Sequence, residues 1–393
     1  MYLHAFGLAI FQLQREIFGM RLFTPFYFFS TITPFFKVKM VENCDFLLSL
    51  LFSLTIVTMS MLLSKKIITA ILIMATILSI GCSSAERYIT IEGEALGTFV
   101  QLKCSTTEQE SAISNMIAEV DGEAKASMSI FNPDSRIARL NNNETDSLDK
   151  HIAYNIELAG RFTTLSDGAY DITIKPLTDA WGFGRKDATI NPNIDSILTF
   201  VGYDKISIDG MRLHKSDPRV QIDLNSIAKG YVVDMIATRL EAMGIVNYMV
   251  NIGGEIRCRG KNNRGTVWSI GIETPYDGNM SMDSYEKIIE IEDAAVATSG
   301  NYRRFYLTED GRKVAHTIDP RNGYSVVSNL LSVTIIAPTC AEADAAATMF
   351  MSLGSEGNAV RLAQWCEREY GWKYYFIFAG DEEYDIACSK IFE

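Results

Sequence analysis

Hydrophobic residues recur every three or four positions in several stretches of the chain beyond residue 85. In residues 108–128, for example, Ile113, Met116 and Val120 fall on one face of a helix. This period is typical of amphipathic helices that pack against a core. It predicts helices over residues 108–128, 149–165, 226–243, 341–353 and 356–370, the third of them ended by Gly244.

Other stretches alternate between hydrophobic and polar residues, which is typical of strands with one buried face. Residues 87–104 have the pattern of two such strands broken around Leu96-Gly97-Thr98. Further strands are predicted over residues 204–208, 220–224, 248–252, 255–259, 267–272, 287–291, 305–308, 314–318, 330–337 and 373–378. Because helices and strands come in blocks instead of in strict alternation, we expect an α+β fold, one large domain with a mostly antiparallel sheet and flanking helices.

The first 81 residues have a different pattern and are crowded with Phe, Leu and Ile. Lys65-Lys66 precedes the apolar run Ile67–Ile80, and the segment Leu78–Cys82 ends in a cysteine. A basic stretch, an apolar stretch too short to span a membrane and a small-residue cleavage site together indicate a secretory signal. A cysteine directly after the cleavage point is similar to a bacterial lipoprotein signal, whose thiol receives lipid.

We therefore expect three regions along the chain. Residues 61–81 would be a lipoprotein signal peptide, and residues 82–393 the exported domain, anchored to the membrane through lipid on Cys82. This places the domain on the periplasmic side of the inner membrane; the alternative is an uncleaved membrane anchor. Residues 1–60 precede a complete export signal, so they are either an over-extended gene start, with Met59 or Met61 as the initiator, or an extra hydrophobic segment.

The charge of the exported part argues against one class of partner. The chain has 36 basic and 48 acidic residues, and residues 1–81 hold only 6 and 3 of them, so the domain carries a net charge of −15. A surface this acidic repels nucleic acid phosphates, and we expect no nucleic acid partner. The five cysteines after Cys82 show no C-x-x-C pair and no zinc-finger spacing, so most should be buried thiols.

Two segments have residues suited to a phosphate and to a metal ion. The first, Asp223-Leu-Asn-Ser226, precedes a predicted helix whose first turn holds Lys229. Such a helix start can bind a phosphate, but a plain N-cap explains the segment equally well. In the second, Asp344 and Thr348 lie four residues apart on one helix face, and their oxygens suit Mg²⁺. Taken alone, this segment is more simply explained as an alanine-rich helix packed tightly against its neighbours.

A third segment holds a candidate base. His316 stands three residues before Asp319 on a predicted strand that ends in Asp-Pro. A histidine beside a carboxylate could take a proton from a hydroxyl nucleophile, whereas an isolated histidine is more often a hydrogen-bonded core residue. The sequence has no G-x-S-x-G, Walker or G-x-G-x-x-G motif, which counts against common hydrolases, P-loop enzymes and Rossmann proteins.

The order in which short motifs follow one another is more specific than any of them alone. These motifs are Leu96-Gly97-Thr98, Met128-Ser-Ile-Phe131 with Ser135 and Asn141, Gly168-Ala-Tyr-Asp171 with Trp181-Gly-Phe-Gly184, Asp223–Gly230, Asn251-Ile-Gly-Gly254, Thr298-Ser-Gly300, His316-Thr-Ile-Asp-Pro320 with Asn322-Gly323, and Ala343-Asp344 with Thr348. The series resembles the ApbE family of FAD:protein FMN transferases over nearly all of the exported part. The resemblance implies a domain related to the T-fold, which binds FAD as its substrate together with Mg²⁺.

The resemblance also implies roles for individual residues. Ser226, through its carbonyl, would hold Mg²⁺ with Asp344 and Thr348. His316 would be the general base, with Asp319 orienting it or acting in its place. The positions that would contact FAD are Leu96, Phe131, Ala169, Tyr170, Asp171, Asp223, Lys229 and Ile318. The sequence departs from the family at Tyr170, Phe131 and Asn225-Ser226, where Phe, Tyr and small residues such as Gly-Gly are frequent, yet stacking rings and a backbone carbonyl remain.

The reaction implied is Mg²⁺-dependent transfer of FMN from FAD to a Thr or Ser hydroxyl of a partner flavoprotein, with release of AMP. Family acceptors are flavin-carrying subunits of redox membrane complexes, such as the sodium-pumping NADH:quinone reductase (Nqr) and the related Rnf complex. Two alternatives stay open: water as the acceptor, which gives FMN and AMP, and a flavin-binding lipoprotein without catalysis. The second would tolerate loss of the magnesium ligands, yet Asp344 and Thr348 are present.

The signal pattern makes a prediction about the mature chain. Protein isolated from the membrane fraction should begin at Cys82 and carry lipid there, because the Leu78–Cys82 segment marks the cleavage point. Peptide mass mapping measures this directly. Native peptides from residues 1–60 would contradict both the cleavage and the over-extended start.

Overall fold

The structure, a computed structural model, describes residues 87–184, 192–275, 285–301, 305–307, 313–354, 356–380 and 384–392. These residues belong to one compact unit, Ala85–Glu393. The predictions for residues 1–60 and 61–81 and for Cys82 lie outside the described residues. Within the described ranges, no helix combines the length and the apolar character that crossing a bilayer requires.

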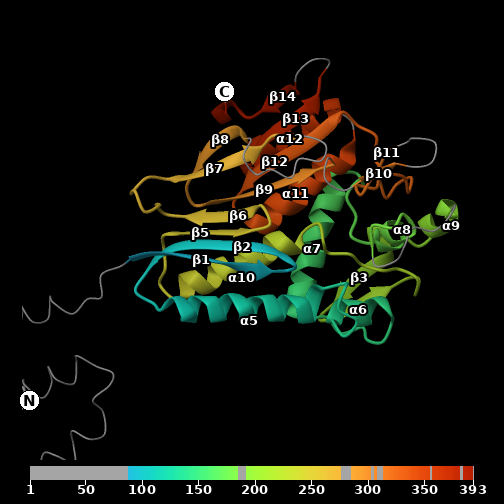
Figure 1. The fold of residues 1–393 in the computed structure, drawn as a ribbon. Helices are drawn as coiled ribbons and strands as arrows, with labels where there is room; N and C mark the ends of the chain where they lie inside the picture. The colour runs from blue at the N-terminus through green and yellow to red at the C-terminus, as the bar shows by residue number, and fades with distance from the viewer. Residues whose placement is uncertain are drawn as a thin grey trace, which may run out of the picture. The chain divides into compact units, whose positions relative to one another are not determined.

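An eight-stranded sheet forms the centre of this unit, and all of its strand pairs are antiparallel. In the order in which they lie side by side (Figure 1), the strands are β1 (Arg87–Ala95), β2 (Thr98–Thr106), β5 (Tyr248–Ile252), β6 (Glu255–Arg259), β9 (Ala294–Gly300), β12 (Leu330–Ala337), β13 (Lys373–Ala379) and β14 (Tyr384–Cys388). The α+β class with a mostly antiparallel sheet is therefore confirmed.

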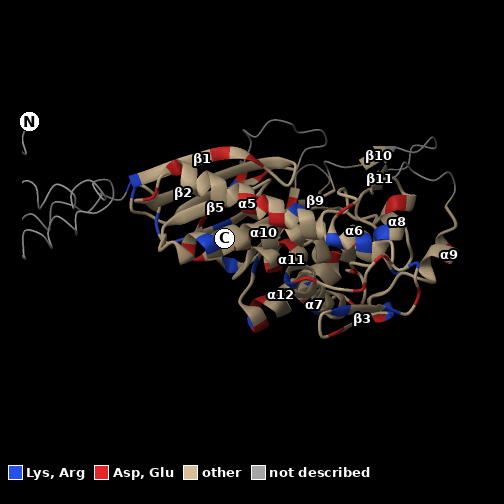
Figure 2. Cartoon of the chain, turned by 90° about the horizontal axis from the view of Figure 1, so that it is seen from below, with Lys and Arg blue, Asp and Glu red and all other residues tan. Residues whose placement is uncertain are grey.

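Helices cover one face of this sheet (Figure 1). The helices of the described residues are α5 (Glu110–Met128), α6 (Arg136–Asn141), α7 (Lys150–Leu165), α8 (Lys175–Ala180), α9 (Ile194–Leu198), α10 (Ala228–Ala242), α11 (Cys340–Leu353) and α12 (Glu356–Tyr370), with the 3-10 turns η1 (Tyr203–Lys205) and η2 (Lys390–Phe392). Of these, α6, α8 and α9 lie beyond the end of the sheet, and η2 packs on its other face. Helices α5, α10 and α11 contact the sheet directly, and α10 packs along α11. Figure 2 shows acidic and basic residues interspersed over the helices and strands.

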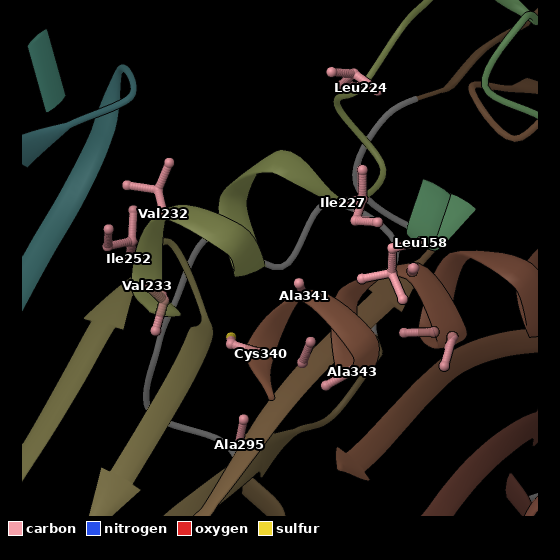
Figure 3. Packing of buried hydrophobic residues seen from close by; sticks show 14 of the residues in the cluster. Leu158, Leu224, Ile227, Val232, Val233, Ile252, Ala295, Cys340, Ala341 and Ala343 are labelled. Carbon is pink, nitrogen blue, oxygen red and sulfur yellow. The ribbon is translucent and has the colours of Figure 1, made fainter. Parts of the chain in front are cut away.

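Side chains on the two faces of the sheet enter two different cores. On the helical side, Val232 and Val233 of α10 lie beside Ile252 of the sheet, and Ala343 of α11 belongs to the same core (Figure 3). On the other side, Met249 packs with the hairpin β7 (Trp268–Glu273) and β8 (Tyr285–Ile291). The remaining hairpins are β3 (Ile206–Asp209) with β4 (Arg212–Lys215), and β10 (Phe305–Leu307) with β11 (Lys313–Ala315). Each large side chain buried in these cores contributes about 1.5–3 kcal/mol to stability.

The contact between α10 and α11 requires a glycine. A Cβ at Gly230 would lie 2.2 Å from the Cys340 carbonyl oxygen and 2.8 Å from the Asp344 Cβ. Asp234 of α10 holds the same two helices together, because its carboxylate accepts hydrogen bonds from the N–H groups of Cys340 and Ala341, at 2.9 Å each. These N–H groups belong to the first turn of α11 and have no partner inside that helix. The two helices are thereby fixed beside each other.

Residues 220–224 differ most clearly from the predicted elements. Val220, Ile222 and Leu224 alternate and are fully buried, yet the segment makes only an isolated bridge to residue 174 instead of a strand. The side-chain amide of Asn141 replaces a neighbouring strand, because it accepts from the Ile222 N–H at 2.7 Å and donates to the Ile222 carbonyl oxygen at 2.8 Å. The backbone is satisfied by a side chain, which the hydrophobic period cannot reveal.

The other differences concern ends and short elements. The predicted strand 314–318 stops at Ala315, because residue 318 forms only an isolated bridge to residue 325. The predicted helix 226–243 begins at Ala228. Helices α6, α8 and α9, strand β4 and strand β14 were not predicted, since elements of four to six residues are too short to show a hydrophobic period. Strand β9 was not predicted either, because its first four residues are all apolar and do not alternate with polar ones.

The packing at Gly230 makes a prediction about stability. Gly230→Ala should lower the free energy of unfolding by about 1–3 kcal/mol, because the added methyl group forces α10 away from α11. Gly122→Ala on α5 is the matched control: this glycine is exposed, nothing lies within 4 Å of its Cβ, and alanine should stabilise the helix by up to about 1 kcal/mol. Urea unfolding measures the change in the free energy of unfolding for both variants. Equal changes would show that the approach of α10 to α11 imposes no constraint.

Candidate functional site

Tyr170 marks the point at which several of the predicted site residues meet. Its side chain is buried, and its hydroxyl lies 2.9 Å from the Ser226 Oγ, just before α10. Burial raises the pKa of the Tyr170 phenol, and the negative charges of Asp344, Asp171 and Asp223 raise it further, against the hydrogen bond to Ser226. Charges interact this way only at short range. Residues far apart in the sequence therefore converge on one phenol.

Two left-handed residues turn the chain into this position after α7. Asp167 has φ 52° and Gly168 φ 76°. The Asp171 carboxylate then accepts from the Thr173 N–H at 2.8 Å and from the Tyr203 N–H at 2.7 Å, using one oxygen for each. Burial raises the pKa of Asp171, and these hydrogen bonds oppose the rise. Because both oxygens bind the protein itself, the Asp171 side chain holds this turn in place. Ala169 is buried within it.

The first turn of α10 brings a lysine close to two buried carboxylates. The Gly230 N–H donates to Asp344 Oδ2 at 3.0 Å, and the Lys229 Nζ donates to Glu255 Oε1. Burial opposes the charge on Lys229, but Glu255 and Asp344 outweigh it, so the pKa of the ammonium is raised. Lys229 therefore keeps its positive charge at a helix end that also favours anions.

Glu255 is a site residue that the sequence patterns did not indicate. It is the first residue of β6 and only 3% exposed. Burial raises the pKa of its carboxyl to about 7, although Lys229 lowers it. The one available signal was an acidic residue directly after the Asn251-Ile-Gly-Gly254 turn, where the chain enters a strand of the central sheet.

Asp344 and Thr348 lie one turn apart on α11, as their spacing predicts. Asp344 is buried, and burial raises the pKa of its carboxyl while Lys229 opposes the rise. Among the described residues only the Gly230 N–H donates to this carboxylate, and it uses Oδ2. The Thr348 Oγ1 lies 3.3 Å from the Ser299 Oγ of β9. One carboxylate oxygen of Asp344 is thus left for another ligand.

This set of oxygens fits a magnesium ion. A buried carboxylate with an unused oxygen, a hydroxyl one helical turn away and the backbone at Ser226 supply hard oxygen ligands, which Mg²⁺ prefers. Within the described part of the chain, no group of three His, Cys, Asp or Glu residues could hold a metal ion. Magnesium is commonly held by one or two carboxylates together with substrate phosphates, so the residues present are sufficient.

Two turns lie against each other at the start of β2. Leu96 has φ 53°, and its N–H donates to Asp121 Oδ1 at 2.8 Å. The Gly253 N–H donates to the Phe99 carbonyl oxygen at 3.0 Å, and a Cβ at Gly253 would lie 2.8 Å from the Thr98 Cγ2. The motifs at residues 96–98 and 251–254 are therefore neighbours in space.

Phe131 follows α5, and its side chain is 59% exposed.

His316 and Ile318 are supported by a smaller hydrophobic cluster. Ile318 is buried there, and the Trp181 Nε1 donates to the Gly323 carbonyl oxygen at 2.7 Å. The buried residues that pack with Ile318 are Leu177, Ile194 and Val201. Ile318 therefore uses its side chain for packing.

The His316 imidazole lies edge-on to the Phe183 ring, with 6.3 Å between the ring centroids. The Asp319 carboxylate accepts from the Arg321 Nε at 2.9 Å and Nη2 at 2.7 Å. The pairing of Asp319 with His316 stays a prediction. A cavity of about 370 Å³ joins this segment to the Tyr170 turn, since Gly168 and Asp171 line it together with Pro320 and Arg321.

Comparison with known proteins identifies the family. The ApbE family model matches residues 96–372. The FAD:protein FMN transferase of Haemophilus influenzae is 35% identical over 317 residues, which are 76% of this chain and 90% of that protein. The chain belongs to the ApbE family. The FAD:protein FMN transferase of Vibrio cholerae is 34% identical over 72% of this chain and 87% of its own length.

Solved ApbE structures have the same fold. The flavin transferase ApbE from Vibrio cholerae superposes with a TM-score of 0.69 at 30% identity, covering 78% of this chain and 98% of that one. The flavinyl transferase ApbE of Pseudomonas stutzeri, in its apo form, gives 0.69 at 28% identity, covering 78% and 96%. The order of motifs along the sequence therefore led to the correct family.

Proposed function

We propose that this chain is an FAD:protein FMN transferase. It transfers FMN from FAD to a Thr or Ser hydroxyl of a partner flavoprotein, depends on Mg²⁺ and releases AMP. The observation that carries the proposal is the meeting of Lys229, Asp344 and Ser226 at the start of α10, in a chain of the ApbE family. Relatives at 35% and 34% identity are named for this activity.

The start of α10 binds the pyrophosphate of FAD. Lys229 supplies a permanent positive charge, and the start of the helix adds the partial positive charge of the helix dipole. Asp344 and Thr348, with the Ser226 carbonyl, would hold Mg²⁺ beside the phosphates. When bound, the ion neutralises the pyrophosphate and stabilises the negative charge that develops on AMP.

His316 accepts the proton from the acceptor hydroxyl. The hydroxyl oxygen forms a bond to the FMN phosphorus, the bond from that phosphorus to the bridging oxygen breaks, and AMP leaves with the electron pair. Seven further residues surround the substrate, several of them through their backbone. They are Leu96, Phe131, Ala169, Tyr170, Asp171, Asp223 and Ile318. The product is a protein with FMN linked through a phosphoester.

The acceptor and the location belong to the same proposal. The signal pattern at residues 61–82 supports export and a lipid anchor, and export would bring the enzyme to the periplasmic side of the inner membrane. Flavin-carrying subunits of Nqr- or Rnf-like redox complexes would be the acceptors there.

Intact mass spectrometry tests the transfer. Incubation with FAD, Mg²⁺ and a candidate acceptor domain should add the mass of FMN less water to the acceptor, because condensation with a hydroxyl releases AMP. Asp344→Ala should abolish this gain, since it removes the charged magnesium ligand. Glu342→Gln is the matched control on the same helix, whose partly exposed ion pair with Arg161 lies outside the site and is worth little. Free FMN produced whether or not acceptor is present would instead identify a hydrolase.

The proton transfer makes a separate prediction. His316→Ala should slow FMN transfer by about 10²–10⁴-fold, the usual contribution of a positioned base, while FAD binding followed by flavin fluorescence changes little. The wild-type rate should fall on the acid side as the imidazole gains a proton, and the variant should lack this limb. His214→Ala, which changes an exposed histidine of strand β4, should behave as the wild type. Near-normal transfer with an unchanged acid limb in His316→Ala would place the base elsewhere.

A further inference from the structure

Glu255 takes part in no step of the proposed reaction, yet it is built into the site. Its Oε1 accepts from the Lys229 ammonium, and its Oε2 is buried without a hydrogen-bond partner among the described residues. The Lys229 side chain is 38% exposed and that of Glu255 only 4%. A buried carboxylate with an unpaired oxygen is costly to keep, so such a residue is expected to have a function.

The position of Glu255 is fixed by the turn before it. Gly253 and Gly254 have φ of 60° and 102°, a conformation that glycine adopts without strain. Thr98 leaves no room for a side chain at Gly253. The turn thereby places Glu255 at the first position of β6, facing α10. It holds this carboxylate rigidly, as a flexible loop could not.

Lys229 stands between two carboxylates and bonds to one of them. The charges of Glu255 and Asp344 both act on the ammonium, with Glu255 the stronger. Among the described residues, the hydrogen bond goes to Glu255 alone. Asp344 is bound instead by the neutral Gly230 N–H, through Oδ2. Among the described residues, no cationic side chain is therefore bonded to the Asp344 carboxylate.

We propose that Glu255 is a positioning residue that holds the Lys229 ammonium away from Asp344 and thereby leaves the Asp344 carboxylate to the divalent cation. The inference rests on the proposed function, in which Asp344 binds Mg²⁺. Without Glu255, the ammonium would turn to Asp344, the other carboxylate whose charge acts on it, and compete with the metal ion for it.

Binding of Mn²⁺ to the purified full-length chain tests this without relying on activity. The electron paramagnetic resonance signal of free Mn²⁺ gives the dissociation constant directly. Glu255→Gln should weaken Mn²⁺ binding by roughly tenfold, within the range of coupling between groups in contact. Lys229→Met removes the competing ammonium, so the double variant Lys229→Met/Glu255→Gln should bind Mn²⁺ within about twofold of Lys229→Met alone.

The double variant separates positioning from charge. If Glu255→Gln weakens Mn²⁺ binding as much in the Lys229→Met background as it does with Lys229 present, Glu255 acts by its charge alone and the proposal is wrong. Unchanged Mn²⁺ binding in the single variant Glu255→Gln also overturns the proposal. Glu255→Met, whose apolar side chain suits a buried position, repeats the test should Glu255→Gln not fold. Glu241→Gln, a carboxylate of α10 paired with Arg259, is the matched control and should leave binding unchanged.

Asp344→Ala distinguishes failure of this inference from failure of the metal site itself. Loss of Mn²⁺ binding in Asp344→Ala, combined with wild-type binding in Glu255→Gln, overturns the role of Glu255 and leaves the proposed function standing. Wild-type binding in Asp344→Ala overturns both. A crystal structure of Glu255→Gln should show the Lys229 Nζ within ion-pair distance of the Asp344 carboxylate.

Discussion

The approach of α10 to α11 at Gly230 is the constraint on which the rest of the site depends. With no side chain between them, the Gly230 N–H reaches Asp344, and Asp234 reaches the first N–H groups of α11. Lys229 and Asp344 belong to helices whose other faces are buried in the main core. A ligand set built on packed helices keeps its geometry better than one on loops. The apolar core therefore determines where the charged atoms lie.

Burial of these side chains also has an electrostatic cost. It raises the pKa of the carboxyl groups of Glu255, Asp344 and Asp234, so each carboxylate is destabilised in its charged form. Each is also bound by a donor that favours the charge: Lys229, the Gly230 N–H, and Arg257. A structure selected for stability alone could replace such groups by apolar residues. Their retention here fits a site in which a cation and a phosphate compensate one another.

The sequence predicted the elements whose pattern is local and missed those that depend on distant partners. Helices α5 and α7 were found because one period covers them from end to end. Residues 220–224 were misassigned because Asn141, a side chain far away in the sequence, pairs with their backbone. Glu255 escaped for a similar reason: its importance comes from sheet topology, which places β6 beside α10. The motif order supplied the family, and the structure supplied the contact of Tyr170 with Ser226 and that of the Gly230 N–H with Asp344.

The residues proposed to bind the phosphate and the metal ion are held by a larger hydrophobic core than the segment that carries the proposed base. The phosphate and metal site belongs to the main core, whereas His316 lies beside a smaller cluster of four buried side chains, one of which is Ile318. Trp181, which packs against this cluster, donates to the Gly323 carbonyl oxygen. Less buried apolar surface means a smaller cost of local rearrangement. This division suits the reaction, because the charges around the pyrophosphate must be in place before the chemistry begins. The base, by contrast, must meet a hydroxyl carried by another folded protein. The segment around His316 can therefore adjust to the acceptor while α10 and α11 keep their register.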